Sequence, residues 1–238
     1  AQVARDFKEA GLPMVMSGFF LAGCFLFFVL ALANTTVANA LFVIASIPLL
    51  TACCGTVFFG EAVSRPTWIA IAVAGCGVGL MVGDALRAGG LVGSLFAFLV
   101  AVCFSVNANL VRHHRRISLL PGVFLAGAIS ALVAAPFALP SAPTVVDFTF
   151  LAFLGFIQLG LGLVLFTVGT RAVPAAQSVL IGLLEVVLGP LWVWIAYGEE
   201  PGGLALAGGL LVLGAVVFNA TIGAVSASKV GGGARSVV

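Results

Sequence analysis

The sequence predicts an all-α membrane protein, a polytopic bundle of helices, and two observations carry this prediction. Of the 238 residues, 62% are hydrophobic and only 8% are charged, and the mean hydropathy is +1.28. A soluble domain usually carries about 25% charged residues. The apolar residues also form runs of about 20 residues, the length that a helix needs to cross a bilayer. The chain is therefore expected to lie within a lipid bilayer.

Eight candidate spans follow from hydropathy and from the turn residues between the apolar runs. The breaks are rich in Gly, Pro, Asn and Ser, for example in "ANTT", "GDALRAGG" and "PSAPTVVD". The predicted helices cover 14–33, 37–59, 67–83, 91–111, 119–139, 148–170, 175–197 and 203–222. The remaining Gly- and Ser-rich residues, 223–238, are predicted to form a disordered cytoplasmic tail.

The distribution of cationic residues predicts the orientation of the chain. Eight spans place both ends on one side of the membrane. With both ends inside, the inner segments hold nine of the ten Lys and Arg residues, and Arg87 is the one outside. This bias follows the positive-inside rule. It predicts a multi-pass protein of the cell (inner) membrane whose two ends are cytoplasmic.

An internal repeat relates the two halves. Aligning Gly60 on Gly198 gives an offset of 138 residues, and the same offset pairs Asn39 with Gln177. The paired second and seventh spans are five helices apart, so they cross the membrane in opposite directions, as in the inverted repeats of many transporters. Residues 1–90 are then a partial first repeat of three helices and residues 91–222 a second repeat of five.

The start of the chain agrees with a partial first repeat. The segment "AQVARDFKEAGLP" is charged and has no apolar h-region, so it is not a signal peptide. It has the character of an inner loop between two spans. By symmetry two helices are expected to be absent upstream, so that eight of ten helices are present.

Two stretches resemble a known family. They are "LANTTVANALFVIASIPLLTACCGTVFFGEAVSRPTWIAIAVAGCGVGLMVG" and "GFIQLGLGLVLFTVGTRAVPAAQSVLIGLLEVVLGPLWVWIAYGEEP". They look like the two repeat signatures of EamA-type transporters in the drug/metabolite transporter superfamily. The resemblance implies a ten-helix carrier with a central cavity, which moves amino acids, other small metabolites or drugs, often outward. The second signature often reads Leu-Glu-Pro, whereas here Val186 follows Glu185 and the proline comes at Pro190, which shifts the expected kink.

Glu185 is the first candidate for a substrate-binding residue. It lies near the centre of the seventh span, on one helix face with Ser178 and Trp192. A charge at mid-membrane costs about 2.5–3.5 kcal/mol, and no Lys or Arg lies in mid-span to pair with it. Glu185 is therefore expected to be protonated part of the time and to bind a transported proton or a cationic substrate group. The alternative is a protonated glutamate that bonds to a neighbouring helix and serves packing alone.

Three further polar residues are candidates for lining a cavity. Gln158 lies in the middle of the sixth span, where its amide can donate to a carboxylate or to a substrate. Its alternative role is an interhelical hydrogen bond without a ligand. Asn39 and Ser46 lie seven residues apart on one face of the second span, where Pro48 cannot donate to the Ile44 carbonyl.

Two weaker patterns concern packing. Asn107 and Asn109 lie near the inner end of the fourth span, which predicts an interfacial or capping role. Gly75, Gly79 and Gly83 have the small-xxx-small spacing that favours a close helix contact.

Several function classes are not expected. The sequence has no Gly-x-Ser-x-Gly, no His-Glu-x-x-His and no paired catalytic aspartates, which argues against an enzyme. No metal, cofactor or nucleic acid is expected either. The expected partners are a small-molecule substrate and the lipid bilayer, and the sequence leaves open a transported proton and a homodimer. The rival functions are a membrane scaffold or sensor without transport, and a passive channel.

Overall fold

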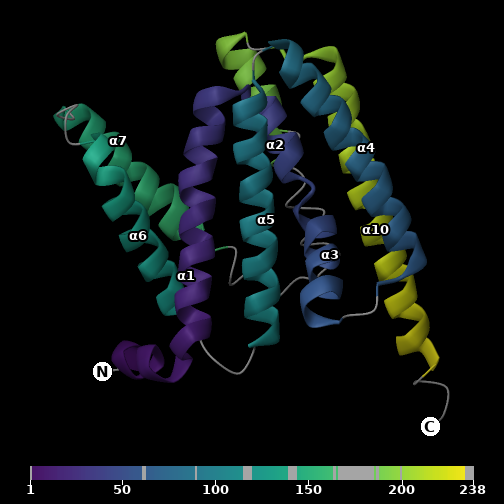
Figure 1. Cartoon of the computed structure of the whole chain (residues 1–238), viewed down its shortest axis with the longest axis horizontal. Helices are drawn as coiled ribbons and strands as arrows, with labels where there is room; N and C mark the ends of the chain where they lie inside the picture. Colours follow the sequence, from purple (N-terminus) through teal and green to yellow (C-terminus); the bar gives the residue numbers. More distant parts are fainter. Residues whose placement is uncertain are drawn as a thin grey trace.

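The computed structural model describes residues 2–60, 63–88, 90–114, 120–138, 144–162, 165, 185, 188–198 and 200–233. The regular elements in these ranges are helical, and Figure 1 shows most of them as long rods that run between two ends of the molecule. They are α1 (Gln2–Asn34), α2 (Val37–Ile44), α3 (Ile47–Phe59), α4 (Arg65–Ala88), α5 (Leu91–His113), α6 (Leu120–Ala138), α7 (Val145–Phe153), the π-helix η2 (Leu154–Leu161), a short helix Leu188–Tyr197 and α10 (Gly203–Gly233).

Among the described residues, five helical segments are long and apolar enough to cross a membrane. They are Gly11–Asn34, Val37–Phe58, Arg65–Gly83, Leu91–His113 and Gly203–Ile222. Shorter apolar helices at Pro121–Phe137, Val145–Leu161 and Leu188–Tyr197 overlap the other three predicted spans, each of which includes residues outside the described ranges. The predicted all-α, polytopic membrane bundle is therefore confirmed.

The helix boundaries differ from the predicted ones at both ends of the chain. The N-terminal segment, predicted to be a loop, is helical over residues 2–10 and turns at Gly11, whose φ of 47° favours glycine. In Figure 1 this short stretch runs across the foot of α1. At the other end, α10 continues as helix to Gly233, so the predicted disordered tail is helical over 223–233. Alanine, serine and lysine in this stretch do not stop a helix, and 234–238 lie outside the described residues.

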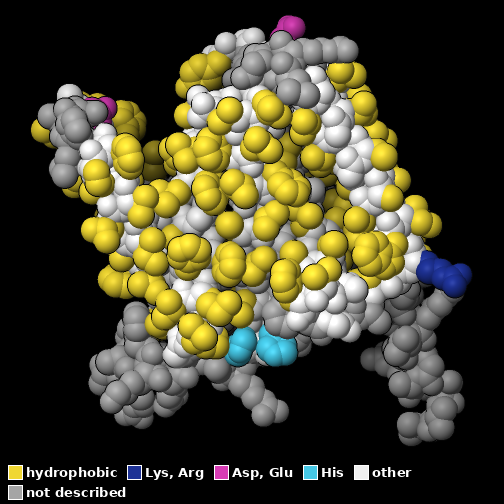
Figure 2. All heavy atoms as spheres, in the orientation of Figure 1, with side chains coloured by type: hydrophobic (Ala, Val, Ile, Leu, Met, Phe, Trp, Pro, Cys, Tyr) yellow, Lys and Arg dark blue, Asp and Glu magenta, His cyan; other side chains and the backbone are white. Residues whose placement is uncertain are grey.

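The helices pack side by side in three groups. α1 lies between α5 and α6, α4 lies along α10, and α2 and α3 lie against α5 (Figure 1). The largest buried cluster joins α2, α3, α4 and α10, and its bulkier members are Phe42, Leu49, Met81, Val212 and Val216. Large apolar side chains cover most of the face seen in Figure 2. Such a surface suits hydrocarbon chains as solvent.

Glycines make the closest contact between α4 and α10. A methyl group added at Gly77 would lie 2.6 Å from the carbonyl oxygen of Gly208 and 3.0 Å from Val212 Cγ2. A methyl group added at Gly208 would meet the Gly77 carbonyl oxygen in turn. Backbone therefore packs on backbone here, and only glycine allows that approach.

The predicted glycine contact is wrong. Within the described part of the chain, no atom lies within 4 Å of a methyl group added at Gly75, Gly79 or Gly83. The buried stripe of α4 is instead Ala70, Ala74, Gly77 and Met81. This stripe follows spacings of four, three and four residues, which stay on one face of a helix, whereas a strict spacing of four drifts around it.

Asn107 and Asn109 join helices, so the expected capping role is wrong, whereas their expected position near the membrane interface stays a prediction. Both side chains are buried. The Ser17 hydroxyl on α1 donates to Asn107 Oδ1 at 2.7 Å. Asn109 Nδ2 donates to the carbonyl oxygens of Thr51 at 2.8 Å and Ser105 at 3.0 Å. A buried amide in an apolar bundle is costly unless a neighbouring helix satisfies it.

Among the described residues, several charged and histidine side chains lie at the two ends of the bundle. Both termini, the start of α4 at Arg65 and the end of α5 at His113 lie at the lower end in Figure 1. In Figure 2 the coloured cationic and histidine side chains lie toward that end, whereas acidic side chains lie toward the upper end. This separation is the one that the cationic bias of the sequence predicts.

Candidate functional site

The second predicted span is interrupted near its middle. α2 ends at Ile44 and α3 begins at Ile47, with Pro48 in the first turn of α3. At the break, the N–H of Ser46 donates to the Val43 carbonyl at 3.1 Å, one residue short of the α-helical spacing. Pro48 has no N–H to offer to the Ile44 carbonyl. A membrane helix tolerates such a break where the freed backbone faces protein or a polar cavity.

Ser46 lies at this break and lines a cavity. Its side chain is buried, and its hydroxyl donates to the Val43 carbonyl at 2.6 Å, which covers the loose end of α2. The cavity has a volume of about 290 Å³ and lies between α3, α4 and α5. Its other described lining residues are apolar: Leu49, Leu50, Ile71, Ala74, Gly75, Val78 and Phe98. Among the described lining residues, Ser46 is therefore the one with a polar side chain.

Asn39 holds the first half of the broken helix to α5. Its Nδ2 donates to Thr35 Oγ1 at 3.0 Å and to Ser94 Oγ at 2.6 Å. The Ser94 hydroxyl in turn donates to the Gly90 carbonyl at 3.1 Å. Thr36 caps α2, since its hydroxyl accepts from the Asn39 N–H. Asn39 is 4% exposed, and its Oδ1 has no hydrogen-bond partner in the described part of the chain.

The second half of the broken helix is held to α5 as well. The Ser105 hydroxyl donates to the Ile47 carbonyl at 3.2 Å, at the first residue of α3. Asn109 reaches the Thr51 carbonyl one turn further along. Polar groups therefore fix both halves against the two ends of α5, and the break between them keeps a defined position.

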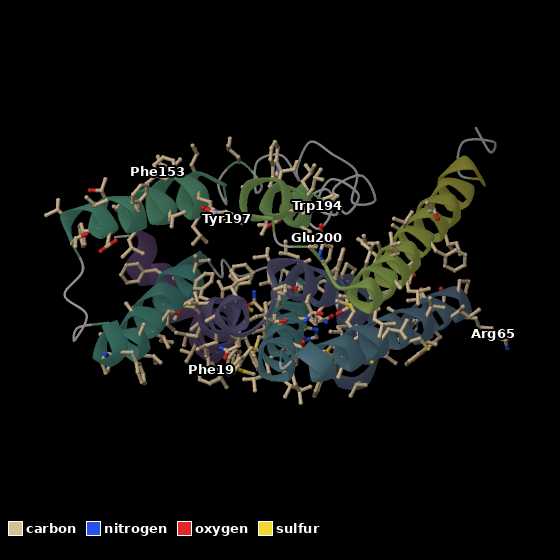
Figure 3. The ribbon with its side chains drawn as sticks, turned by 90° about the horizontal axis from the view of Figure 1, so that it is seen from above. Phe19, Arg65, Phe153, Trp194, Tyr197 and Glu200 are labelled. Carbon is tan, nitrogen blue, oxygen red and sulfur yellow. The ribbon has the colours of Figure 1, made fainter. Side chains whose placement is uncertain are left out.

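A second, larger cavity borders α2. It has a volume of about 430 Å³ and lies between α2, the helix 188–197 and α10. Figure 3 shows Trp194 and Glu200 near one another on this side of the bundle. The described lining residues are mostly apolar and include one acid: Phe42, Pro190, Leu191, Trp194, Glu200, Pro201, Leu206, Leu210 and Leu213.

Comparison with protein families decides the class of the protein. A model of the EamA-like transporter family matches residues 4–83 and 91–221, which is nearly the whole chain. The chain belongs to the EamA-like transporter family. The predicted family is confirmed, and this EamA-like chain is a membrane transporter of small molecules.

The fold of this EamA-like chain also has a solved relative. A crystal structure, described only as that of a protein, matches with a TM-score of 0.56 and 22% sequence identity. The match covers 88% of this chain and 76% of the other. At that identity the likeness shows the fold alone. Comparison with curated proteins gives no match.

The predicted site residues of the EamA-like chain are not all brought together. Ser46 lines the smaller cavity, and Asn39 is buried in its own network. Gln158 lies in the middle of η2, and its side chain and that of Glu185 are both exposed. Ser178 lies outside the described residues, so the shared face with Glu185 stays a prediction, as does the approach of Gln158.

Trp192, the predicted aromatic residue, lines neither of the two cavities described above, so its role at a substrate site stays a prediction. Trp192 of this EamA-like chain is 64% exposed, whereas Trp194, two residues further along the same helix, lines the larger cavity. Sequence reasoning also missed Ser94 and Glu200. The signal for Ser94 was the small-residue start of α5, "GGLVGS", which allows α2 to approach. Glu200 could have been found as the second acid of the loop, because it directly follows the Gly198-Glu199 pair.

Proposed function

We propose that the protein is a secondary carrier that moves small metabolites or drugs outward by alternating access. In this proposal two inverted repeats, 1–90 and 91–222, move against each other around a site near the bilayer midplane. The protein lies in the cell membrane with both ends of this chain in the cytoplasm. The family supplies the transporter class, and the interruption between α2 and α3 is the observation that supports the mechanism.

The interruption fits a carrier because it places free backbone and a hydroxyl inside an apolar span. Discontinuous helices form the midplane sites of many carriers, where open carbonyls and helix ends bind the substrate. In this proposal Ser46 and the Ile44 carbonyl form part of such a site, and the Asn39 hydrogen bond to Ser94 supports it by anchoring the segment on one side of the break. A scaffold does not need a broken membrane helix, which would only cost stability.

Glu185 is proposed to bind either a transported proton or the cationic group of the substrate. Its side chain is exposed, so the packing of the described residues does not block access to the carboxylate. A carboxylate at this depth is costly to retain unless it serves a pathway. Gln158 is proposed to act with it as a hydrogen-bond donor.

Replacing the carboxylate tests this role. The full-length protein would be placed in proteoliposomes, and uptake of radiolabelled amino acids, nucleosides and cationic drugs would be followed with and without a proton gradient. We expect saturable uptake that the gradient stimulates, and we expect Glu185→Gln to lose that stimulation, since an amide neither takes up nor releases a proton.

The matched control is Asp147→Asn, which changes an exposed acid at the start of α7 to its amide and should leave uptake unchanged. If the gradient stimulates wild type and Glu185→Gln equally, Glu185 has no part in coupling. If no substrate in the panel is taken up saturably by wild type, the carrier mechanism loses its support.

A further inference from the structure

The larger cavity is built around two close contacts on α2. A methyl group added at Gly189 would meet the Leu41 side chain, and one added at Gly209 would meet the ring of Phe42 at 2.5 Å. These glycines let the helix 188–197 and α10 touch α2 at neighbouring residues. The 430 Å³ cavity lies between these two helices and α2, and Phe42 is one of its lining residues.

The cavity is polar at one end and apolar along its length. Leu206, Leu210 and Leu213 lie on one face of α10 and extend the apolar wall over about 10 Å. Glu200 and Pro201 precede the first residue of α10, so they line the end of the cavity next to Leu206. Trp194 lies beside Glu200 in Figure 3 and forms part of the facing wall. Among the described lining residues, Glu200 is the one charged group.

This arrangement selects a ligand chemistry. A volume near 430 Å³ falls within the range of about 300–1,000 Å³ that is usual for small-molecule sites. A carboxylate among the lining residues attracts a cation and repels an anion, and an indole ring adds a favourable surface for a cation. The leucine and proline side chains that line the cavity favour the burial of a bulky apolar group. They offer no hydrogen-bond partners to a sugar or a free amino acid.

We propose that this cavity is a binding site for a lipophilic organic cation, with its charge at Glu200 and its apolar body along α10. The site is separate from the break at Ser46, since it shares no lining residue with the smaller cavity. It extends the proposed function by a second site, at the end of the bundle away from the termini. Binding there requires neither a gradient nor turnover.

The test compares two ions of similar shape and opposite charge. The full-length protein in detergent would be titrated with tetraphenylphosphonium and with tetraphenylborate by equilibrium dialysis. We expect saturable binding of the cation and about tenfold weaker binding of the anion. Glu200→Gln should weaken cation binding about fivefold, the upper range for one partly exposed charge pair. Leu210→Trp should abolish binding because the indole fills the cavity.

Two controls make the result decisive. Asp147→Asn removes another exposed acid and should bind the cation as wild type does, and elution as a single species shows that each variant is folded. The proposal is overturned if both ions bind equally and Glu200→Gln changes nothing, which would make the cavity a groove for lipid chains. It is also overturned if Glu185→Gln, and not Glu200→Gln, weakens binding. Failure of transport in proteoliposomes would leave this result unaffected, so the two proposals fail separately.

Discussion

We expect Gly208→Ala and Gly77→Ala each to destabilise the protein strongly. An added methyl group at either position would lie against the backbone carbonyl of the other helix, and a methyl group at Gly208 would also come within 2.6 Å of Met81 Cγ. Backbone cannot move aside as a flexible side chain does, so α4 and α10 must separate. Overpacking of this kind costs about 1–3 kcal/mol. Thermal unfolding in detergent, followed by circular dichroism, measures the loss as a lower melting temperature.

The matched control is Gly79→Ala, two residues further along α4. No described atom lies within 4 Å of its added methyl group. Alanine favours a helix over glycine by about 1 kcal/mol, so this variant should be as stable as wild type or slightly more so. Equal melting temperatures for Gly77→Ala and Gly79→Ala would show that α4 and α10 do not pack along the Gly77 face.

The second large effect is expected on transport. Pro48→Ala supplies the N–H that the Ile44 carbonyl lacks, so the helix can continue from α2 into α3 and withdraw Ser46 from the cavity wall. Proline disfavours a helix interior by about 3 kcal/mol, so its removal favours the continuous form strongly. Transport kcat/KM should fall about tenfold or more in proteoliposomes, because the proposed site is no longer formed.

The control for this variant is Pro136→Ala, which changes a proline within α6. Pro136 is exposed and lies away from the α2–α3 break, so its loss should leave transport near the wild-type rate. The melting temperature of Pro48→Ala should not fall, since a continuous helix has one more hydrogen bond. Wild-type transport by Pro48→Ala would show that the break takes no part in the transport cycle.

Hydropathy predicted where the helices lie, because the bilayer sets one length for every span. Each of the eight predicted segments contains helix in the described residues. The break between Ile44 and Ile47 was only partly predictable. Pro48 pointed to a freed carbonyl, but proline at the first turn of a helix is also a normal start, so the sequence did not distinguish a kink from two helices.

Contacts between helices were harder to predict than the helices themselves. The central residues of α4, from Trp68 to Gly83, are all apolar or small and can face lipid or protein. Glycine spacing alone therefore selected Gly75, Gly79 and Gly83, whereas the contact is at Gly77. The partner surface on α10, with Gly208 and Gly209, decides which face is used. Asn109 was similarly ambiguous, because its depth along α5 allowed a cap, and only the position of α3 shows that it reaches the Thr51 carbonyl.

The most direct test of the carrier proposal is substrate counterflow. Proteoliposomes containing the full-length protein would be preloaded with an unlabelled substrate, and entry of the same labelled substrate from outside would be timed. An alternating-access carrier returns faster with substrate than empty, so we predict saturable entry that the internal substrate accelerates. Entry that rises linearly with concentration and is indifferent to internal substrate would indicate a channel and contradict the account.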